Sequence, residues 1–360
     1  MRFAIIPWAD KYLKDRMFDI DDPAINYDNR QEPYLDMQKE FERKGHELHT
    51  IDLFENLEEV DYFLFFELEW HWILKISKLN KLDRMVYCNA EPPSVNAINS
   101  PDGYQYLKHF FPYIMSWNSD WVDGKLIYKR NIPYYFKKLV VSNIPFEEKK
   151  LLTSISGYKK SDYPGELYSE RERLIDYFEQ NYPQDFDFYG SGWDKQGHSC
   201  YRGHAGVKAE VYQKYRFALC LENIGGIKGY ITEKILDCLT AGIVPVYLGA
   251  TDICEYIPKN CFVDYRKFKT YDDLAKYLLV MKEDEYNRFL QVAADFLNSD
   301  AILAFSGQQY AQNIIDAVSN RKMFEINRKD MREVAKNAVK QNRNKWIIRS
   351  KIRIKGYFGK

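Results

Sequence analysis

Residues 217–250 read FALCLENIGGIKGYITEKILDCLTAGIVPVYLGA, and this stretch decides the fold. The apolar run at its start predicts a strand, and the glycines behind it predict a loop in which the backbone approaches a ligand closely. Thr232 is expected to cap a helix that stops at Gly242, and a second apolar run predicts the next strand. The helix would present unpaired N–H groups and a partial positive charge, so its start is suited to binding a diphosphate.

The same alternation of strands and helices covers most of the chain. Apolar runs predict further strands at 2–6, 46–53, 60–66, 85–88 and 186–189, and helical periodicity appears at 34–44 and 171–180. Such alternation is typical of parallel sheets with crossover helices. The stretch 137–164, rich in Lys, Ser and Glu, is interpreted as a linker. We therefore predict an α/β protein with two Rossmann-like domains facing one cleft, at 1–150 and 151–325, and a basic amphipathic tail at 326–360.

The composition is that of a globular protein with room for two cores. Of the 360 residues, 46 % are hydrophobic and 29 % are charged. Aromatic residues make up 16 %, which suits ligands such as sugar rings and a nucleobase but equally suits a large core. The six cysteines form no CxxC pair, and no histidine has metal-ligand spacing, so neither a zinc site nor a disulfide framework is indicated.

Two terminal segments bear on where the protein acts. The apolar run at the N-terminus is cut by Pro7, so it is too short for a signal peptide or a membrane span, and we expect a cytoplasmic protein. Residues 326–360 hold twelve Lys or Arg and two acids, a net charge of +10, while the whole chain is neutral. Interleaved apolar residues predict peripheral binding to the anionic inner face of the plasma membrane. A solubilising tail and a helix that braces the domains are the alternatives. Nucleic acid is not an expected partner, because the body is acidic and contains no recognition module.

The quoted stretch also resembles a known family. The order Glu222-Asn223, Tyr230-Ile231-Thr232-Glu233-Lys234, Ala241-Gly242 and Val244-Pro245-Val246 is similar to the donor-site signature of the α1,3-fucosyltransferases. Weaker resemblance covers most of 85–286. The resemblance implies a glycosyltransferase of the two-domain fold called GT-B. It also implies GDP-β-L-fucose as the donor substrate and a hydroxyl, O3 of GlcNAc, in a galactose-containing glycan as the acceptor.

The resemblance implies roles for individual donor-site residues. Lys234 and an upstream arginine would hold the diphosphate, Glu233 would contact the ribose, and Asn223 with Tyr230 would form the floor of the donor pocket. The arginine is identified as Arg171, which opens the predicted helix before the 186–189 strand; Arg173, two positions away, is the alternative. Three further residues are candidates for the donor site: Lys208, Arg130 and Glu222.

Glu91 would be the general base. A carboxylate at the carboxyl end of a strand can take the proton from the acceptor hydroxyl as it attacks the anomeric carbon opposite GDP, which gives inversion. On the residues alone, a glutamate beside two prolines is more often a loop residue, and the resemblance is what favours the catalytic role. No metal or other cofactor is expected, because Lys234 and Arg171 would neutralise the departing diphosphate. The DxD pattern of Asp185 and Asp187 runs into a predicted strand and is interpreted as structural.

The predicted function is fucosyl transfer from GDP-fucose to a glycan, and two alternatives stay open. The signature mostly addresses diphosphate and ribose, so a GT-B transferase that uses a different nucleotide sugar fits as well. A catalytically inactive sugar-binding protein is the second alternative, against which the joint presence of Glu91, Glu233 and Lys234 argues. Residues 26–33 and 92–103 are expected to contact the acceptor, but they carry no pattern that identifies it.

Overall fold

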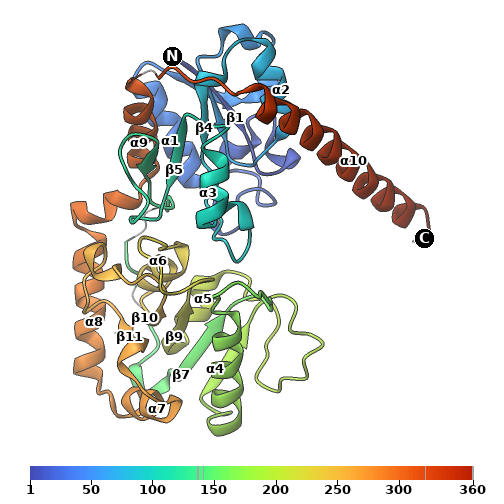
Figure 1. Cartoon of the computed structure of the whole chain (residues 1–360). Coiled ribbons are helices and arrows are strands. Elements are labelled where there is room, and N and C mark those ends of the chain that lie inside the picture. The colour runs from blue at the N-terminus through green and yellow to red at the C-terminus, as the bar shows by residue number, and fades with distance from the viewer. Residues whose placement is uncertain (136–137, 141, 321, 359–360) are drawn as a thin grey trace.

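The computed structural model describes residues 1–135, 138–140, 142–320 and 322–358, with side chains through residue 344. Two parallel sheets lie one above the other, each with its own helices (Figure 1). We call the first sheet with the elements packed on it the N-terminal half, and the second the C-terminal half. The predicted α/β architecture with two parallel-sheet units is confirmed.

The N-terminal half is built on six parallel strands in the order β2-β1-β3-β4-β5-β6. The strands are β1 (Arg2–Ile6), β2 (Glu47–Thr50), β3 (Tyr62–Phe65), β4 (Met85–Tyr87), β5 (Tyr113–Ser116) and β6 (Ile127–Lys129). Helices α1 (Glu32–Arg43), α2 (Trp70–Lys78) and α3 (Pro101–Leu107) lie between them. Strand β3 is buried along its whole length, which explains why it is a continuous apolar run in the sequence.

The C-terminal half is a five-stranded parallel sheet in the order β11-β10-β9-β7-β8. Its strands are β7 (Lys150–Ile155), β8 (Phe186–Tyr189), β9 (Tyr215–Leu221), β10 (Val244–Leu248) and β11 (Val263–Asp264). Its helices are α4 (Tyr168–Asn181), α5 (Lys208–Tyr212), α6 (Glu233–Thr240), α7 (Tyr271–Val280) and α8 (Glu283–Leu297). Thr232 caps α6, and Gly242 follows its end in the left-handed region, as expected.

The predicted linker at 137–164 is wrong for its second part. Residues 150–155 form β7, which pairs with β8 on one side and β9 on the other. Two of its fully buried residues, Thr153 and Ser154, are polar. The strand therefore lacks the apolar signal by which a buried parallel strand is recognised in a sequence.

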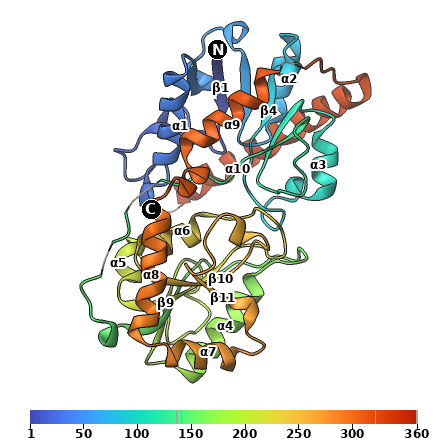
Figure 2. The same cartoon turned by 90° about the vertical axis from the view of Figure 1, so that its left-hand side faces the viewer.

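The chain returns to the N-terminal half after α8. Helix α9 (Gly307–Ser319) packs against α1 and contributes to the core of the first sheet (Figure 2). A side chain at Gly307 would meet the carbonyl oxygen of Pro33 at 2.0 Å, so only glycine allows the two helices to approach this closely. The domain boundaries given above stay a prediction, and residues 307–319 pack with the N-terminal half.

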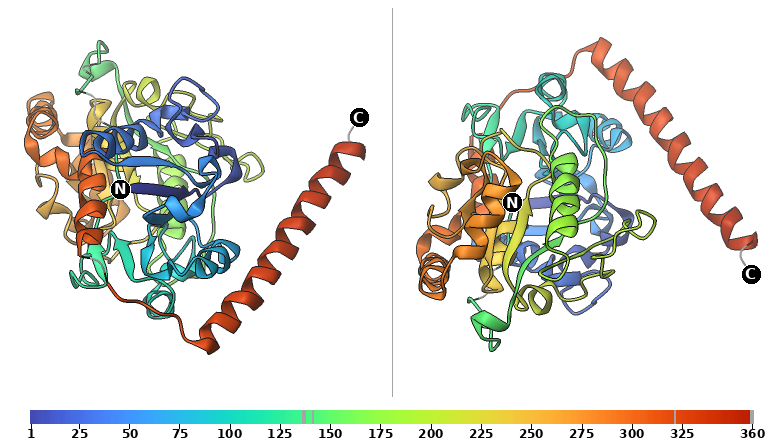
Figure 3. Two further views of the ribbon diagram at one scale, coloured as in Figure 1. Left: turned by 90° about the horizontal axis from the view of Figure 1, so that it is seen from above. Right: turned by 90° about the horizontal axis from the view of Figure 1, so that it is seen from below.

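The basic segment forms a long helix, α10 (Arg328–Phe358), whose first part is docked. It packs on α2, where Val334 and Ala338 are buried, and the Gln341 amide accepts the backbone N–H of Trp70 at 2.9 Å. The helix then extends away from the body of the molecule (Figure 3). Among the described residues, no helix is both long enough and apolar enough to cross a bilayer.

Candidate donor and acceptor site

The start of α6 is held by a buried carboxylate. Glu222, directly after β9, is fully buried and accepts the Thr232 N–H at 2.8 Å and the Thr232 hydroxyl at 2.7 Å. The Lys234 ammonium lies 3.1 Å from the same carboxylate and 3.0 Å from the Thr232 hydroxyl. Burial alone would lower the pKa of Lys234, but the carboxylates of Glu222 and Glu233 raise it above its ordinary value. Lys234 is therefore a fixed cation at the N-terminus of α6.

Arg171 lies at the other side of the same strand end. It is buried in α4, and its Nη2 donates to the carbonyl oxygens of Leu221 at 2.8 Å and Glu222 at 3.1 Å. Its guanidinium also lies 5.5 Å from the centre of the Tyr168 ring. Desolvation lowers its pKa, although an arginine remains charged at neutral pH. Arg173 instead points outward and pairs with Glu170. Of the two candidates, Arg171 lies at the carboxyl end of β9.

Glu91 projects from a tightly braced segment behind β4. Asn89 accepts the Glu91 N–H at 3.0 Å, and Asn99 donates to the Glu91 carbonyl at 2.7 Å. The indole N–H of Trp117 donates to the carbonyl of Ala90 at 3.0 Å. The backbone is thus held on both sides of the residue, while the Glu91 side chain is exposed. Preorganisation of this kind is what a reacting group requires.

The charged residues that act on the Glu91 carboxyl group belong to the C-terminal half. Desolvation raises the pKa of its carboxyl group; Lys159 and Lys234 oppose this shift, and Glu233 adds to it. Lys159 lies in the segment between β7 and α4, and this segment reaches the N-terminal half where Ser161 donates to the carbonyl of Ser94 at 3.1 Å. Glu91 and the start of α6 therefore share one electrostatic environment, although they belong to different halves.

Tyr230 and Asn223 lie where the two halves meet. Tyr230 is buried, and its ring centre is 4.8 Å from that of Trp117 in the N-terminal half. Asn223 is 3.5 Å from the Tyr230 hydroxyl. Gly229, one residue earlier, has φ +77°, and a Cβ there would lie 2.1 Å from the carbonyl oxygen of Trp117. The glycine-rich loop thus approaches the backbone of the other half so closely that a side chain has no room.

Two further candidates have structural partners. Lys208 lies 2.8 Å from Asp237 in α6 and 2.8 Å from Asp28 in the N-terminal half, so it bridges the halves. Burial raises the pKa of Asp237 to about 6, although Lys208 opposes that shift. Arg130 is buried beneath the Glu91 segment, where it donates to the carbonyl of Cys88 at 2.9 Å and to the hydroxyl of Tyr310 at 2.6 Å.

The DxD pattern is divided between the surface and the core. Asp185 is exposed, and Asp187 is buried in β8. The Asp187 carboxylate lies 2.6 Å from Lys150, 2.7 Å from Arg202 and 2.8 Å from the Tyr215 hydroxyl. Its oxygens therefore connect β7, β8 and β9. In the part of the chain that is described, no three His, Cys, Asp or Glu residues are grouped as metal ligands would be.

Comparison with known proteins identifies the second part of the chain. Residues 149–320 match the family model "Glycosyltransferase family 10 (fucosyltransferase) C-term". We call this stretch, which is just under half of the chain, the family 10 segment. The family 10 segment contains Arg171, Glu222, Glu233 and Lys234, and it ends just after α9.

Curated relatives match over part of the chain. The "Alpha-(1,3)-fucosyltransferase FucT" of Helicobacter pylori is 30 % identical over 103 residues, 29 % of this chain and 20 % of that protein. The rat "4-galactosyl-N-acetylglucosaminide 3-alpha-L-fucosyltransferase 9" is 30 % identical over 180 residues, 47 % of this chain and 44 % of that protein. The chain thus spans less than half the length of these relatives.

Solved structures extend the likeness to both halves. The crystal structure of an α1,3-fucosyltransferase is similar with a TM-score of 0.54 and 16 % identity, over 89 % of this chain and 91 % of that one. The predicted GT-B fold is therefore confirmed. A DNA-modifying β-glucosyltransferase that uses uridine diphosphoglucose has a TM-score of 0.53 at 11 % identity, over 89 % of this chain and all of that one. The fold is shared by enzymes with different donors, so it does not specify the sugar.

Several residues around Glu91 and Lys208 were not assigned a role from the sequence. The Glu91 segment is supported by hydrogen bonds from Trp117 and Asn99, and Lys159 acts on the Glu91 carboxyl group electrostatically. Asp28 pairs with Lys208. Asn99 lies only eight positions after Glu91, so its contact with the Glu91 carbonyl is local in the sequence. The other contacts join segments far apart in the sequence, and no local pattern indicates them.

Proposed function

We propose that the protein transfers L-fucose from GDP-β-L-fucose to O3 of GlcNAc in a galactose-containing glycan, with inversion at the anomeric carbon. The observation that carries the proposal is the placement of Glu91. Its backbone is fixed, its side chain is exposed, and it shares an electrostatic environment with Lys234 at the start of a family 10 helix. This arrangement supports the assignment of Glu91 as the base and of Lys234 as a cation for the diphosphate.

The donor would bind at the carboxyl ends of β9 and β10. The N-terminus of α6 offers N–H groups and a partial positive charge to the diphosphate, and Lys234 adds a full charge. Arg171 supplies a second cation at the end of β9. Glu233 is exposed at the first turn of α6, where its carboxylate can accept hydrogen bonds from the ribose hydroxyls. Tyr230 and Asn223 would close the site from below.

Lys234 has to serve two anions. Its ammonium contacts the buried Glu222 carboxylate, and a bound diphosphate would be a second negative partner on its solvent side. Because an ammonium group has three donors, one can remain on Glu222 and another can reach a phosphate oxygen. Glu222 then acts as a positioning residue that keeps Lys234 directed toward the donor.

In the proposed reaction, Glu91 takes the proton from the acceptor hydroxyl while the oxygen of that hydroxyl forms a bond to the anomeric carbon. The bond from that carbon to the diphosphate breaks on the opposite face, and the electron pair leaves with GDP. Lys234 and Arg171 stabilise the charge that develops on the leaving group, so no metal is required in this scheme. The raised pKa of Glu91 makes it a stronger base than an ordinary glutamate.

The decisive experiment supplies purified protein with GDP-fucose and an array of galactose- and GlcNAc-containing glycans. Formation of a fucosylated product, with its linkage and anomeric configuration determined by NMR, would support the proposal. Transfer from UDP-glucose or GDP-mannose instead would show a different donor. If the protein neither transfers fucose nor slowly hydrolyses GDP-fucose, it is catalytically inactive.

We further propose that the projecting part of α10 binds an anionic membrane surface. The segment 342–360 contains seven Lys or Arg residues and no acidic residue. It continues a helix whose docked part ends near Gln341. Each basic residue near such a surface contributes about 1 kcal/mol at low ionic strength, so binding should weaken steeply with salt.

A further inference from the structure

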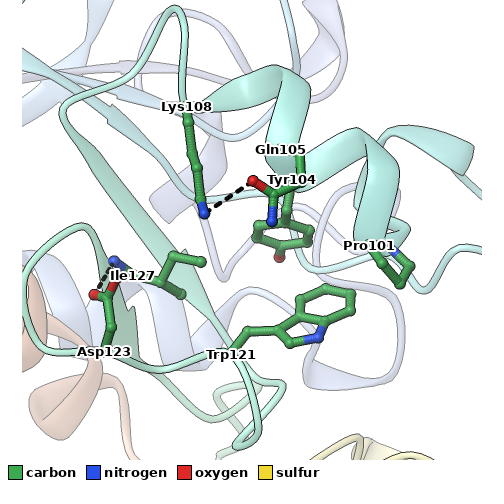
Figure 4. A pocket seen from close by; sticks show the side chains of 7 residues that line it. All are labelled: Pro101, Tyr104, Gln105, Lys108, Trp121, Asp123 and Ile127. Carbon is green, nitrogen blue, oxygen red and sulfur yellow. Dashed lines mark hydrogen bonds between the residues drawn. The ribbon is translucent and has the colours of Figure 1, made fainter.

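A pocket of about 140 Å³ lies on the N-terminal half beside α3 (Figure 4). Tyr104 and Trp121 form its aromatic wall, with ring centres 4.5 Å apart. Tyr104 is buried and Trp121 is half-buried, so the indole is supported from behind and still reaches the pocket. Pro101 and Ile127 complete its apolar lining.

Polar groups stand opposite this aromatic wall. Lys108 donates to the Gln105 side-chain oxygen at 3.1 Å, which leaves further ammonium protons and the Gln105 amide N–H groups for a ligand. Asp123 accepts the backbone N–H groups of 125, 126 and 127 through Oδ1, and its Oδ2 accepts from none of the described residues. Burial opposes ionisation, but the three N–H donors lower the pKa of Asp123 below its ordinary value. The pocket thus offers both donors and an anionic acceptor.

This combination suits a sugar ring. A pyranose has a C–H face that packs on an aromatic ring and a rim of hydroxyls that both donate and accept hydrogen bonds. A purely apolar ligand would leave the Asp123 carboxylate and the Lys108 ammonium without partners, which is unfavourable on desolvation. The chemistry of the lining therefore favours a carbohydrate.

The pocket is connected to the reacting region by a short chain of contacts. The Trp121 ring centre lies 6.5 Å from that of Trp117, which in turn lies 4.8 Å from Tyr230 and donates to the carbonyl of Ala90. The segment that follows Glu91 leads directly into α3, which Ser100 caps. The pocket and the proposed base are therefore connected both by the Trp121–Trp117 contact and by the chain segment between Glu91 and α3.

We propose that this pocket is a subsite for a distal pyranose ring of a linear acceptor glycan, a ring beyond the sugar that receives fucose. The proposal rests on the proposed function and adds an acceptor-length preference to it. Glycans long enough to reach the pocket gain its stacking and hydrogen-bonding interactions, whereas shorter acceptors contact only the region around Glu91.

The test compares the disaccharide of galactose and GlcNAc with a linear tetrasaccharide of the same sugars. The Gln105→Trp variant fills the pocket from an exposed helix position, and the Trp121→Ala variant removes the platform. Each should raise the apparent KM for the tetrasaccharide by about tenfold, the factor for one modest interaction. The KM for the disaccharide and the affinity for GDP should stay within about twofold. Lys125→Ala, an exposed change in the neighbouring turn, is the control and should alter neither.

Binding measured without turnover separates this proposal from the proposed function. Ligand-observed NMR should show tetrasaccharide binding to the wild-type protein and binding weakened by about tenfold in Gln105→Trp, whether or not fucose is transferred. If both acceptors lose affinity equally, or if neither does in folded Gln105→Trp protein, the pocket is not a distal sugar subsite. If tetrasaccharide binding follows the prediction but no fucose is transferred, the proposed reaction fails and the subsite stands.

Discussion

Replacement of Lys234 by alanine should have two separable effects. The first is on the donor: the variant loses one charge-assisted contact to the diphosphate, so GDP affinity should fall by about 1.5–3 kcal/mol, or roughly 10- to 150-fold. The second is on stability, because Lys234 is the cation nearest the fully buried Glu222 carboxylate. Breaking a fully buried pair costs about 3–5 kcal/mol.

The stability effect should be smaller than that limit. Lys234 keeps a quarter of its side chain exposed, and Glu222 retains two donors from Thr232. We therefore expect a loss of about 1–3 kcal/mol in the free energy of unfolding. Adding Glu222→Gln to Lys234→Ala removes the stranded charge, so the double variant should regain most of the stability and none of the GDP affinity.

Urea unfolding and isothermal calorimetry with GDP measure the two effects separately. The matched control is Lys276→Ala, which removes one positive charge from an exposed pair with Asp272 in the same half. This variant should change stability by less than about 1 kcal/mol and leave GDP binding unchanged. A folded Lys234→Ala protein that binds GDP as tightly as the wild type would refute the assignment of Lys234 to the diphosphate.

Three other predictions concern the reaction and the tail. Glu91→Gln should lower the transfer rate by about 10²–10⁴ at unchanged GDP affinity. The base must be ionised, and desolvation raises its pKa, so wild-type kcat/KM should begin to fall on acidification at a pH above the ordinary glutamate range. The variant should not show this acidic decrease in kcat/KM. Wild-type turnover by the variant at saturating acceptor would contradict that role. Transfer should persist in excess EDTA within about a factor of two or three, and loss restored by manganese would contradict a metal-free scheme. Deletion of 342–360 should abolish sedimentation with anionic liposomes without changing the melting temperature, whereas deletion from Arg328 should lower it because Val334 is buried; unaltered liposome binding would refute the membrane role.

The fold was predictable where sequence periodicity and burial agree. β1 and β8 were predicted with their observed ends: β1 is an apolar run, and β8 is rich in aromatic residues and followed by the turn residues of Gly190 to Gly192. β7 was missed because Thr153 and Ser154 are buried without being apolar. The position of α9 could not be predicted from local sequence either, because its apolar face packs against α1, which ends at Arg43.

The sequence predicted individual elements of the candidate site, but not the contacts that bring them together. The quoted stretch indicated a capped helix with Lys234 in its first turn, and the structure contains that helix. The contact of Lys234 with Glu222 followed from no rule of spacing, since it depends on how the loop between them closes. The bridge from Lys208 to Asp28 spans 180 positions and can be recognised only once the two halves are placed together.

Arg130 connects the Glu91 segment to the part of the chain that matches the family 10 model. Arg130 donates to the carbonyl of Cys88, three residues before Glu91, and to the hydroxyl of Tyr310 in α9. Tyr310 lies within the family 10 segment, yet α9 packs on the N-terminal sheet. Among the described residues, Nε and Nη2 of Arg130 have no hydrogen-bond partner, so a buried cation is retained there at an energetic cost. A residue that only filled the core would be better replaced by an apolar one. We infer that the guanidinium is kept because it connects the segment after β4, which carries Glu91, to α9, which returns from the C-terminal half.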